Sequence, residues 1–209
     1  MKITIIGASA GIGLATVQQA LSIGYDVTAL STQTESIADH AHLTKVNGSA
    51  TSVSDLIKVM THAEAVIIAV GTKNKKPNTL FSDTATALVK AGAALNFKGP
   101  VLIITGFGAG ASSGFLGFFM RTVIRFFLKH QYINKTMMEE IIANSNLNWE
   151  IVRPGVLTDG PLTQKYKVLT NLYKGIKIGK ISRADVADFL LREAEHPIML
   201  KQYPALTSL

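Results

Sequence analysis

The fold of this chain is decided by its N-terminal stretch, Ile3-Thr4-Ile5-Ile6-Gly7-Ala8-Ser9-Ala10-Gly11-Ile12-Gly13. The apolar, β-branched run from Ile3 to Ile6 predicts a buried strand. The chain breaks at Gly7, and residues 14–21 have the composition of a helix. A strand therefore runs into a glycine-rich turn, and the turn opens a helix.

Each glycine of this turn has its own structural reason. Gly7 permits the tight turn, Gly11 lets the main chain approach a pyrophosphate, and Gly13 lets helix and strand pack closely. Free N–H groups at the positive end of the helix dipole suit phosphate groups. An ordinary turn also uses glycine, but this spacing favours a dinucleotide-binding loop. The predicted loop contacts are Gly7, Ser9, Ala10, Gly11, Ile12 and Gly13.

The length and composition limit the kinds of protein that this chain can be. The 209 residues suffice for one well-buried α/β domain, and 47% of them are hydrophobic. We expect a cytoplasmic protein, because no apolar run is long enough to cross a bilayer and the N-terminus lacks a signal peptide. The absence of cysteine excludes disulfides, thiolate metal sites and a cysteine nucleophile.

The net charge of +7 suits an anionic ligand such as a phosphorylated small molecule. No nucleic-acid-binding module is recognisable, so we expect no nucleic acid partner. We also expect no metal site, because His40 and His42 lack further ligands at a recognisable spacing. The lysine-rich stretch 72–78 is interpreted as a solvated loop.

The rest of the chain alternates predicted strands and helices. Strands are predicted at 26–30, 43–46, 64–71, 101–105, 149–152 and, as a last edge strand, within 198–207; helices at 34–42, 53–60 and 80–95. This order predicts an α/β fold with a single doubly wound, mostly parallel sheet and helices on both faces. Residues 1–209 are expected to form one domain, with a substrate-side insert at about 107–130 and a C-terminal portion, about 153–209, that closes the site.

The end of the second strand selects between dinucleotides. In a Rossmann unit an acidic residue there holds the ribose hydroxyls, whereas this chain has Ser31 and Thr32. No carboxylate repels a 2′-phosphate and no arginine attracts it, so contacts from Ser9, Ser31 and Thr32 give only a slight preference for NADP over NAD. The carboxyl end of the strand at 64–71 should also lie along the cofactor, through Ala69, Val70 and Gly71.

The spacing Gly7-x-x-x-Gly11-x-Gly13 resembles the short-chain dehydrogenase/reductase family. Typical members carry Tyr-x-x-x-Lys on a later helix, whereas here Tyr132 precedes Lys135 by three residues. The chain is more similar to the atypical branch, which contains flavin reductases and proteins of the biliverdin reductase B type. This resemblance rests on three further segments in the expected order, Lys135–Glu140, Asn148–Pro161 and Ile181–Ala187.

The resemblance implies further site residues. Lys135 would contact the nicotinamide ribose, and Ser49 stands where relatives have an aspartate that contacts adenine. The nicotinamide end would be lined by Thr105, Gly106, Pro154, Gly155 and Val156, and the catalytic candidates are Thr105, Tyr132 and Lys135. Two features are interpreted as structural: an ion pair of Arg153 and a helix cap formed by Ser182-x-x-Asp185.

The insert before Lys135 has a basic stripe, because Arg121, Arg125 and Lys129 recur every four residues. The favoured interpretation is an amphipathic helix with its apolar side in the core. A second is a lid whose Phe107, Phe115 or Phe118 stacks on a flat acceptor while a basic residue holds its phosphate. A helix at a membrane surface ranks third.

Together these features predict an NAD(P)H-dependent reductase. The leading acceptor is a flavin such as FMN, or a similar planar molecule, with hydride passing from nicotinamide C4 to flavin N5. One alternative is a carbonyl or quinone reductase in which Tyr132 or Thr105 assists protonation. Another is a catalytically silent NAD(P)-binding sensor. The expected partner is the small-molecule acceptor, with no membrane partner, and a homodimer is a possible assembly.

Overall fold

The computed structural model describes residues 1–72 and 76–209, so part of the predicted loop at 72–78 lies outside the described residues. Eight strands form the main sheet: β1 (Lys2–Ile6), β2 (Asp26–Ser31), β3 (Leu43–Asn47), β4 (Ala65–Ile68), β5 (Pro100–Ile104), β6 (Asn148–Pro154), β8 (Tyr166–Leu169) and β10 (Ala205–Ser208). Their order is β3-β2-β1-β4-β5-β6-β10-β8, and only β8 runs antiparallel to its neighbour. Strands β7 (Val156–Thr158) and β9 (Lys180–Ser182) pair separately.

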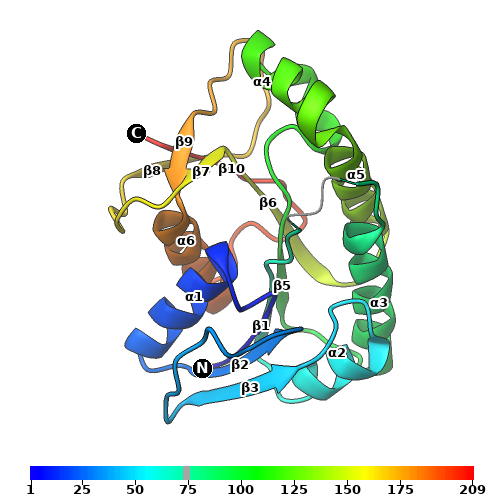
Figure 1. Ribbon diagram of the computed structural model, residues 1–209, viewed down its shortest axis with the longest axis vertical. Coiled ribbons are helices and arrows are strands. Elements are labelled where there is room, and N and C mark those ends of the chain that lie inside the picture. Colours follow the sequence, from blue (N-terminus) through cyan, green and yellow to red (C-terminus); the bar gives the residue numbers. More distant parts are fainter. Residues whose placement is uncertain (73–75) are drawn as a thin grey trace.

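Helices cover both faces of the sheet (Figure 1). Helices α1 (Gly11–Ser22) and α6 (Arg183–Glu195) pack together on one face. Helices α2 (Val53–Met60), α3 (Leu80–Ala94) and α5 (Lys129–Ala143) cover the other. Because both faces are covered, the central strands are apolar at consecutive positions: Ile5 belongs to one core cluster and Ile6 to the other.

The order of the strands reverses beside β1. The chain runs outward from β1 through β2 to β3, and then crosses back to place β4 on the other side of β1. A crevice for ligands forms at the carboxyl ends of the strands where such a reversal occurs. The predicted α/β fold with a doubly wound, mostly parallel sheet is confirmed.

Two predicted elements differ in the structure. Residues 34–42 form turns rather than a helix, because the Thr34 hydroxyl donates to Asn47 Oδ1 at 2.7 Å while Ile37 is buried in the same core cluster as Val27 of β2. The last strand begins only at Ala205 and is not an edge strand, because β8 pairs with its outer side. By contrast, α2 has the predicted bounds, and the Ser52 hydroxyl accepts from the Asp55 N–H at its start.

The prediction that the insert buries its apolar side in the core is wrong. The insert forms a 3₁₀ turn η1 (Gly110–Phe115), helix α4 (Phe118–Val123) and a π-helical turn η2 (Ile124–Leu128) that leads into α5. The exposed fractions of Phe118, Phe119, Phe126 and Phe127 are 88%, 74%, 71% and 65%. In Figure 1, α4 lies beyond the end of the sheet, so the sheet does not cover this helix. No helix among the described residues has the length and apolar character needed to span a membrane.

Gly13 supports a first prediction about stability. A Cβ built on Gly13 would lie 2.1 Å from the main-chain oxygen of Gly7, so any side chain there must push α1 away from the turn. We expect Gly13→Ala to lower the free energy of unfolding by about 1–3 kcal/mol, the usual cost of overpacking. Urea unfolding of the ligand-free protein measures this. Gly114→Ala is the matched control, because a Cβ at Gly114 meets nothing within 4 Å; equal stability of the two variants would contradict the packing role of Gly13.

Candidate active site

The glycine-rich turn lies between the end of β1 and the start of α1. Gly7 has a φ of +82°, and a Cβ there would lie 2.7 Å from the main-chain carbonyl carbon of Ala69. Gly11 has a φ of +56°, and a Cβ there would meet only the Arg183 side chain, at 3.7 Å. The turn therefore passes tightly over β4 at Gly7, while the space above Gly11 is open to a ligand.

A cleft of about 740 Å³, called the main cleft, opens above this turn at the carboxyl ends of the strands. Most predicted cofactor contacts line it: Gly7, Ser9, Ala10, Gly11, Ile12, Ser31, Thr32, Ser49, Ala69, Val70, Gly71, Thr105 and Lys135. Their roles toward a cofactor stay predictions, but the structure brings them together from the carboxyl ends of β1, β2, β3, β4 and β5 and from α1 and α5 into one site.

The other predicted contacts lie elsewhere. Gly13 packs α1 against the turn, and Pro154 is a buried end of β6. Gly106 lies beside Tyr132, because a Cβ built on it would be 3.2 Å from the Tyr132 hydroxyl oxygen. Gly155 and Val156 line a second pocket rather than the main cleft.

The main cleft also contains an ion pair that the sequence analysis missed. Arg183 at the start of α6 donates from Nη1 to Asp159 Oδ1 at 2.6 Å, and both residues line the cleft beside Gly11. Arg183 directly follows the Ser182 cap, which the sequence did indicate and which the structure forms with the Asp185 N–H. Nothing in the local sequence signals that this arginine faces a turn more than 170 residues away.

The end of β2 has hydroxyl groups where a carboxylate would select NAD. The hydroxyl oxygens of Ser9 and Ser31 are 2.8 Å apart and so link the glycine-rich turn to β2. Among the described residues that line the main cleft, the only carboxylate is that of Asp159, which Arg183 neutralises. The cleft therefore does not repel a 2′-phosphate.

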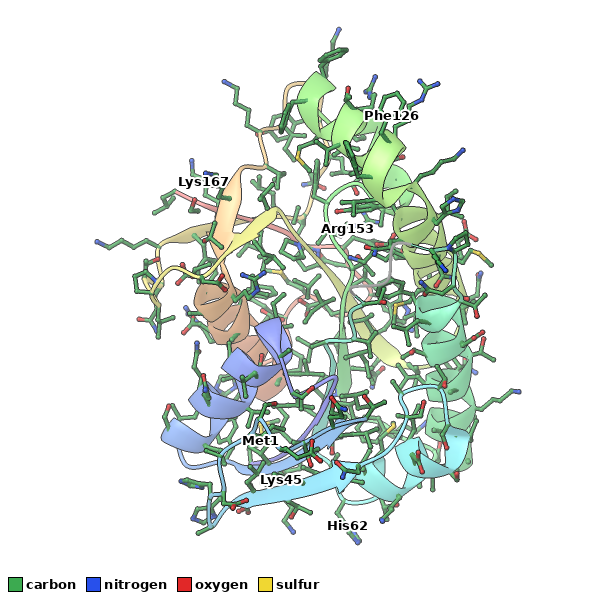
Figure 2. All side chains as sticks on the ribbon, viewed as in Figure 1. Met1, Lys45, His62, Phe126, Arg153 and Lys167 are labelled. Atoms are coloured by element: carbon green, nitrogen blue, oxygen red, sulfur yellow. The ribbon has the colours of Figure 1, made fainter. Side chains whose placement is uncertain are left out.

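A buried network fixes the residues at the end of β5. The Thr105 hydroxyl donates to Glu139 Oε1 at 2.6 Å, and Arg153 donates to both carboxylate oxygens of Glu139, at 3.0 and 2.6 Å. Figure 2 labels Arg153 in the interior, and its side chain is almost fully buried. This confirms the predicted structural ion pair of Arg153. It also commits the Thr105 hydroxyl proton to Glu139, which favours a structural role for that hydroxyl.

Lys135 and Tyr132 stand between the two pockets. Lys135 Nζ donates to the main-chain oxygen of Thr105 at 2.5 Å and lies 5.2 Å from the centre of the Tyr132 ring. Burial lowers the pKa of the Lys135 amine from its ordinary 10.5 to about 8, against the opposing effect of Glu139. Burial also raises the pKa of the Tyr132 phenol, which keeps its proton on the oxygen at neutral pH. The pair thus offers a cation toward the main cleft and a neutral phenol toward the second pocket.

The second pocket, called the apolar pocket, has a volume of about 370 Å³. Its lining is mostly aromatic and aliphatic and includes one lysine, Lys177; the apolar members are Phe107, Phe115, Leu116, Phe118, Phe119, Met120, Tyr132, Val156, Ile176 and Ile178. The phenylalanines that the lid interpretation named, Phe107, Phe115 and Phe118, are all among them. Flat apolar walls of this kind suit a planar aromatic ligand.

Comparisons with known proteins agree with this geometry. A family model described as NAD(P)H-binding matches residues 7–197. A short-chain dehydrogenase/reductase of Veillonella parvula, solved in complex with NADP, is 18% identical, with coverage of 99% of this chain and 94% of its own, and a TM-score of 0.84. ChuY, an anaerobillin reductase of Escherichia coli O157:H7, is 22% identical, with coverage of 100% and 97% and a TM-score of 0.79.

SP1627 of Streptococcus pneumoniae, which has been assigned as an NADH-flavin reductase, is 23% identical, with complete coverage of both chains and a TM-score of 0.77. At these identities the structures show a shared fold. The family match spans most of the chain, and this protein therefore belongs to the NAD(P)H-binding family, with a Rossmann fold.

The pKa of Lys135 supports a second prediction. Below about pH 8 its amine is charged and can donate to a bound ribose; above about pH 8 it loses the proton. We expect dinucleotide affinity to fall by roughly tenfold as the pH rises through this range, the value of one charge-assisted hydrogen bond. Lys135→Met should bind weakly at every pH, whereas the matched variant Lys90→Met, on the exposed side of α3, should follow the wild type. Calorimetry at pH 6.5 and 9.5 measures this. A Lys135→Met variant that keeps the wild-type pH profile would contradict the assigned contact.

Proposed function

We propose that this NAD(P)H-dependent oxidoreductase transfers a hydride to a flavin such as FMN, or to a similar planar acceptor. The observation that carries the proposal is the apolar pocket, which lies beside the main cleft and is lined by flat aromatic side chains. Tyr132 lines the apolar pocket, Lys135 lines the main cleft, and the two side chains are in contact. An acceptor in one pocket would therefore lie next to a dinucleotide in the other.

The residues present fit a dinucleotide. The open space above Gly11 and the free N–H groups at the start of α1 suit a pyrophosphate, and Arg183 stands beside them as a cation. Ser31 and Thr32 would hold the adenosine ribose, with a slight preference for NADP. Lys135 would hold the nicotinamide ribose. When bound, the cofactor supplies the hydride; the protein positions the rings and excludes water from them.

The acceptor side of the site has few polar groups. Phe107 and Phe115 would stack on a planar ring system, and Lys177, which also lines the pocket, would contact a phosphate group of FMN. A flavin needs no dedicated protein acid for hydride acceptance, which agrees with the absence of Tyr-x-x-x-Lys. Two structural neighbours are named as reductases, one as an NADH-flavin reductase and the other, ChuY, as an anaerobillin reductase.

A carbonyl or quinone reductase is the second candidate. It is favoured by the position of the Tyr132 hydroxyl, which faces Gly106 at the junction of the two pockets. The protonated phenol could donate to a developing alkoxide there, with the Lys135 cation nearby to stabilise the resulting phenolate. The Thr105 hydroxyl, committed to Glu139, is the weaker candidate for this role.

Initial rates of NADH and NADPH oxidation, with and without FMN, test the leading proposal. We expect saturable oxidation that depends on FMN and is faster with NADPH at low dinucleotide concentration. Calorimetry on the same sample reports dinucleotide binding independently. Clear binding of the dinucleotide without any FMN-dependent oxidation would exclude the flavin reductase and leave another acceptor or a sensor.

Tyr132→Phe separates the two candidate reactions. The variant keeps the ring and removes only the phenolic proton, so FMN reduction should stay within about twofold of the wild type. Reduction of a carbonyl or quinone should fall by about 100-fold or more, the usual contribution of a general acid. Tyr173→Phe is the control, since Tyr173 is exposed and does not line either pocket. A large loss of FMN reduction in Tyr132→Phe would contradict the proton-independent mechanism.

A further inference from the structure

One end of the molecule exposes aromatic and basic side chains together. Helix α4 and the π-helical turn after it carry four exposed phenylalanines, and Figure 2 labels one of them, Phe126, on the outer side of this arm. We call this end the apical surface and define it by Phe118, Phe119, Arg121, Arg125, Phe126, Phe127 and Lys129, together with Tyr173, Lys174 and Lys177 of the facing segment. All of these side chains are exposed.

Two segments distant in sequence build this surface. The segment between β8 and β9 rises to α4 in Figure 1, and residues of both line the apolar pocket. Neither segment contains an acidic residue: Asp and Glu are absent from 107–138 and from 160–184. The positive charges of the apical surface are therefore not compensated locally.

The exposure of the four phenylalanines is unusual for a protein surface. Large exposed apolar patches with a polar rim mark places where a protein meets a partner or a membrane. The sequence alone favoured a helix that buries this side in the core, and that interpretation is excluded by the structure. Two interpretations of this segment remain: a lid over a flat acceptor and a helix at a membrane surface.

We propose that the apical surface binds the surface of an anionic phospholipid bilayer. Peripheral helices that insert into the headgroup region combine aromatic side chains with neighbouring arginines or lysines. Helix α4 and the turn after it have this combination. The arginines and lysines would contact anionic headgroups, and the phenyl rings would enter the boundary of the acyl chains. This is a peripheral attachment and needs no spanning helix.

The charge of the surface argues against a second copy of the chain as its occupant. A two-fold contact through the apical surface would bring Arg121 and Arg125 of one copy against the same cluster of the other. Like charges held together in an interface cost binding free energy. An anionic bilayer supplies both the opposite charge and an apolar layer for the phenyl rings.

The location of the apical surface bears on how an acceptor reaches the apolar pocket. This step rests on the proposed function. Phe118 and Phe119 belong both to the apical surface and to the lining of the apolar pocket. A protein attached through this surface would open the apolar pocket toward the lipid headgroups. Acceptors that partition into a bilayer would then reach the site without crossing water.

Sedimentation of the full chain with lipid vesicles tests the proposal. We expect binding to vesicles of phosphatidylglycerol and phosphatidylcholine, little binding to phosphatidylcholine alone, and weaker binding at high salt. Arg121→Glu with Arg125→Glu should weaken binding by at least about thirtyfold, because each of the two basic residues lost contributes about fivefold and the new carboxylates repel the anionic headgroups. Lys58→Glu with Lys90→Glu is the matched control: it changes the net charge equally, on exposed positions of α2 and α3, and should stay near the wild type.

A second variant tests the aromatic contribution. Replacing Phe118, Phe119, Phe126 and Phe127 by serine should abolish vesicle binding while the far-ultraviolet circular dichroism stays unchanged, since all four side chains are already exposed. The proposal would be overturned if the protein did not sediment with anionic vesicles, or if the Lys58 and Lys90 control lost vesicle binding as strongly as the arginine variant. It would also be overturned if light scattering showed a dimer that the serine variant dissociates while the protein does not bind vesicles. None of these readouts involves a dinucleotide or FMN, so failure here leaves the proposed reaction to its own tests.

Discussion

The close approach of α1 to the end of β1 is the constraint on which the site depends. Gly13 has no side chain because the main-chain oxygen of Gly7 occupies the place where its Cβ would lie. Gly7 in turn crosses the main chain of Ala69 and donates a hydrogen bond to Leu30 at the end of β2. The first helix can therefore start directly above the reversal of the strand order, with its free N–H groups toward the main cleft.

The second constraint is the buried network at the ends of β5 and β6. Glu139 on α5 accepts from Thr105, which directly follows β5, and from Arg153 on β6, so one carboxylate joins α5 to the ends of two strands. Removing one partner of such a buried pair costs several kcal/mol, because the other charge is left uncompensated. Lys135 lies one helical turn before Glu139 on α5. By fixing α5 against the sheet, the network also fixes the position of the Lys135 amine in the main cleft.

The parts of the fold that are encoded locally could be predicted from the sequence. The strand from Ile3 to Ile6, the glycine-rich turn and the capped helices α2 and α6 depend on residues next to one another in the chain. Most residues of the main cleft could be predicted as well, because a doubly wound sheet places the ends of its central strands together.

The parts that depend on distant contacts could not be predicted. Arg183 reaches the turn at Gly11 only because α6 packs beside α1, and no local pattern reports that packing. The last strand is internal because β8 adds to its outer side after a long connection. The phenylalanines of α4 follow a pattern that fits burial, but the arm extends past the sheet and leaves them exposed.

Calorimetric titration of NADPH into the wild type and into Gly11→Val tests the central claim most directly. The account predicts that the valine fills the space where the pyrophosphate would lie and weakens binding by about 100-fold or more, since a phosphate contact at the helix start is lost. Gly114→Val, at an open surface position, should bind as the wild type does, and circular dichroism verifies that both variants are folded. A folded Gly11→Val variant that binds NADPH with wild-type affinity would contradict the assignment of the glycine-rich turn.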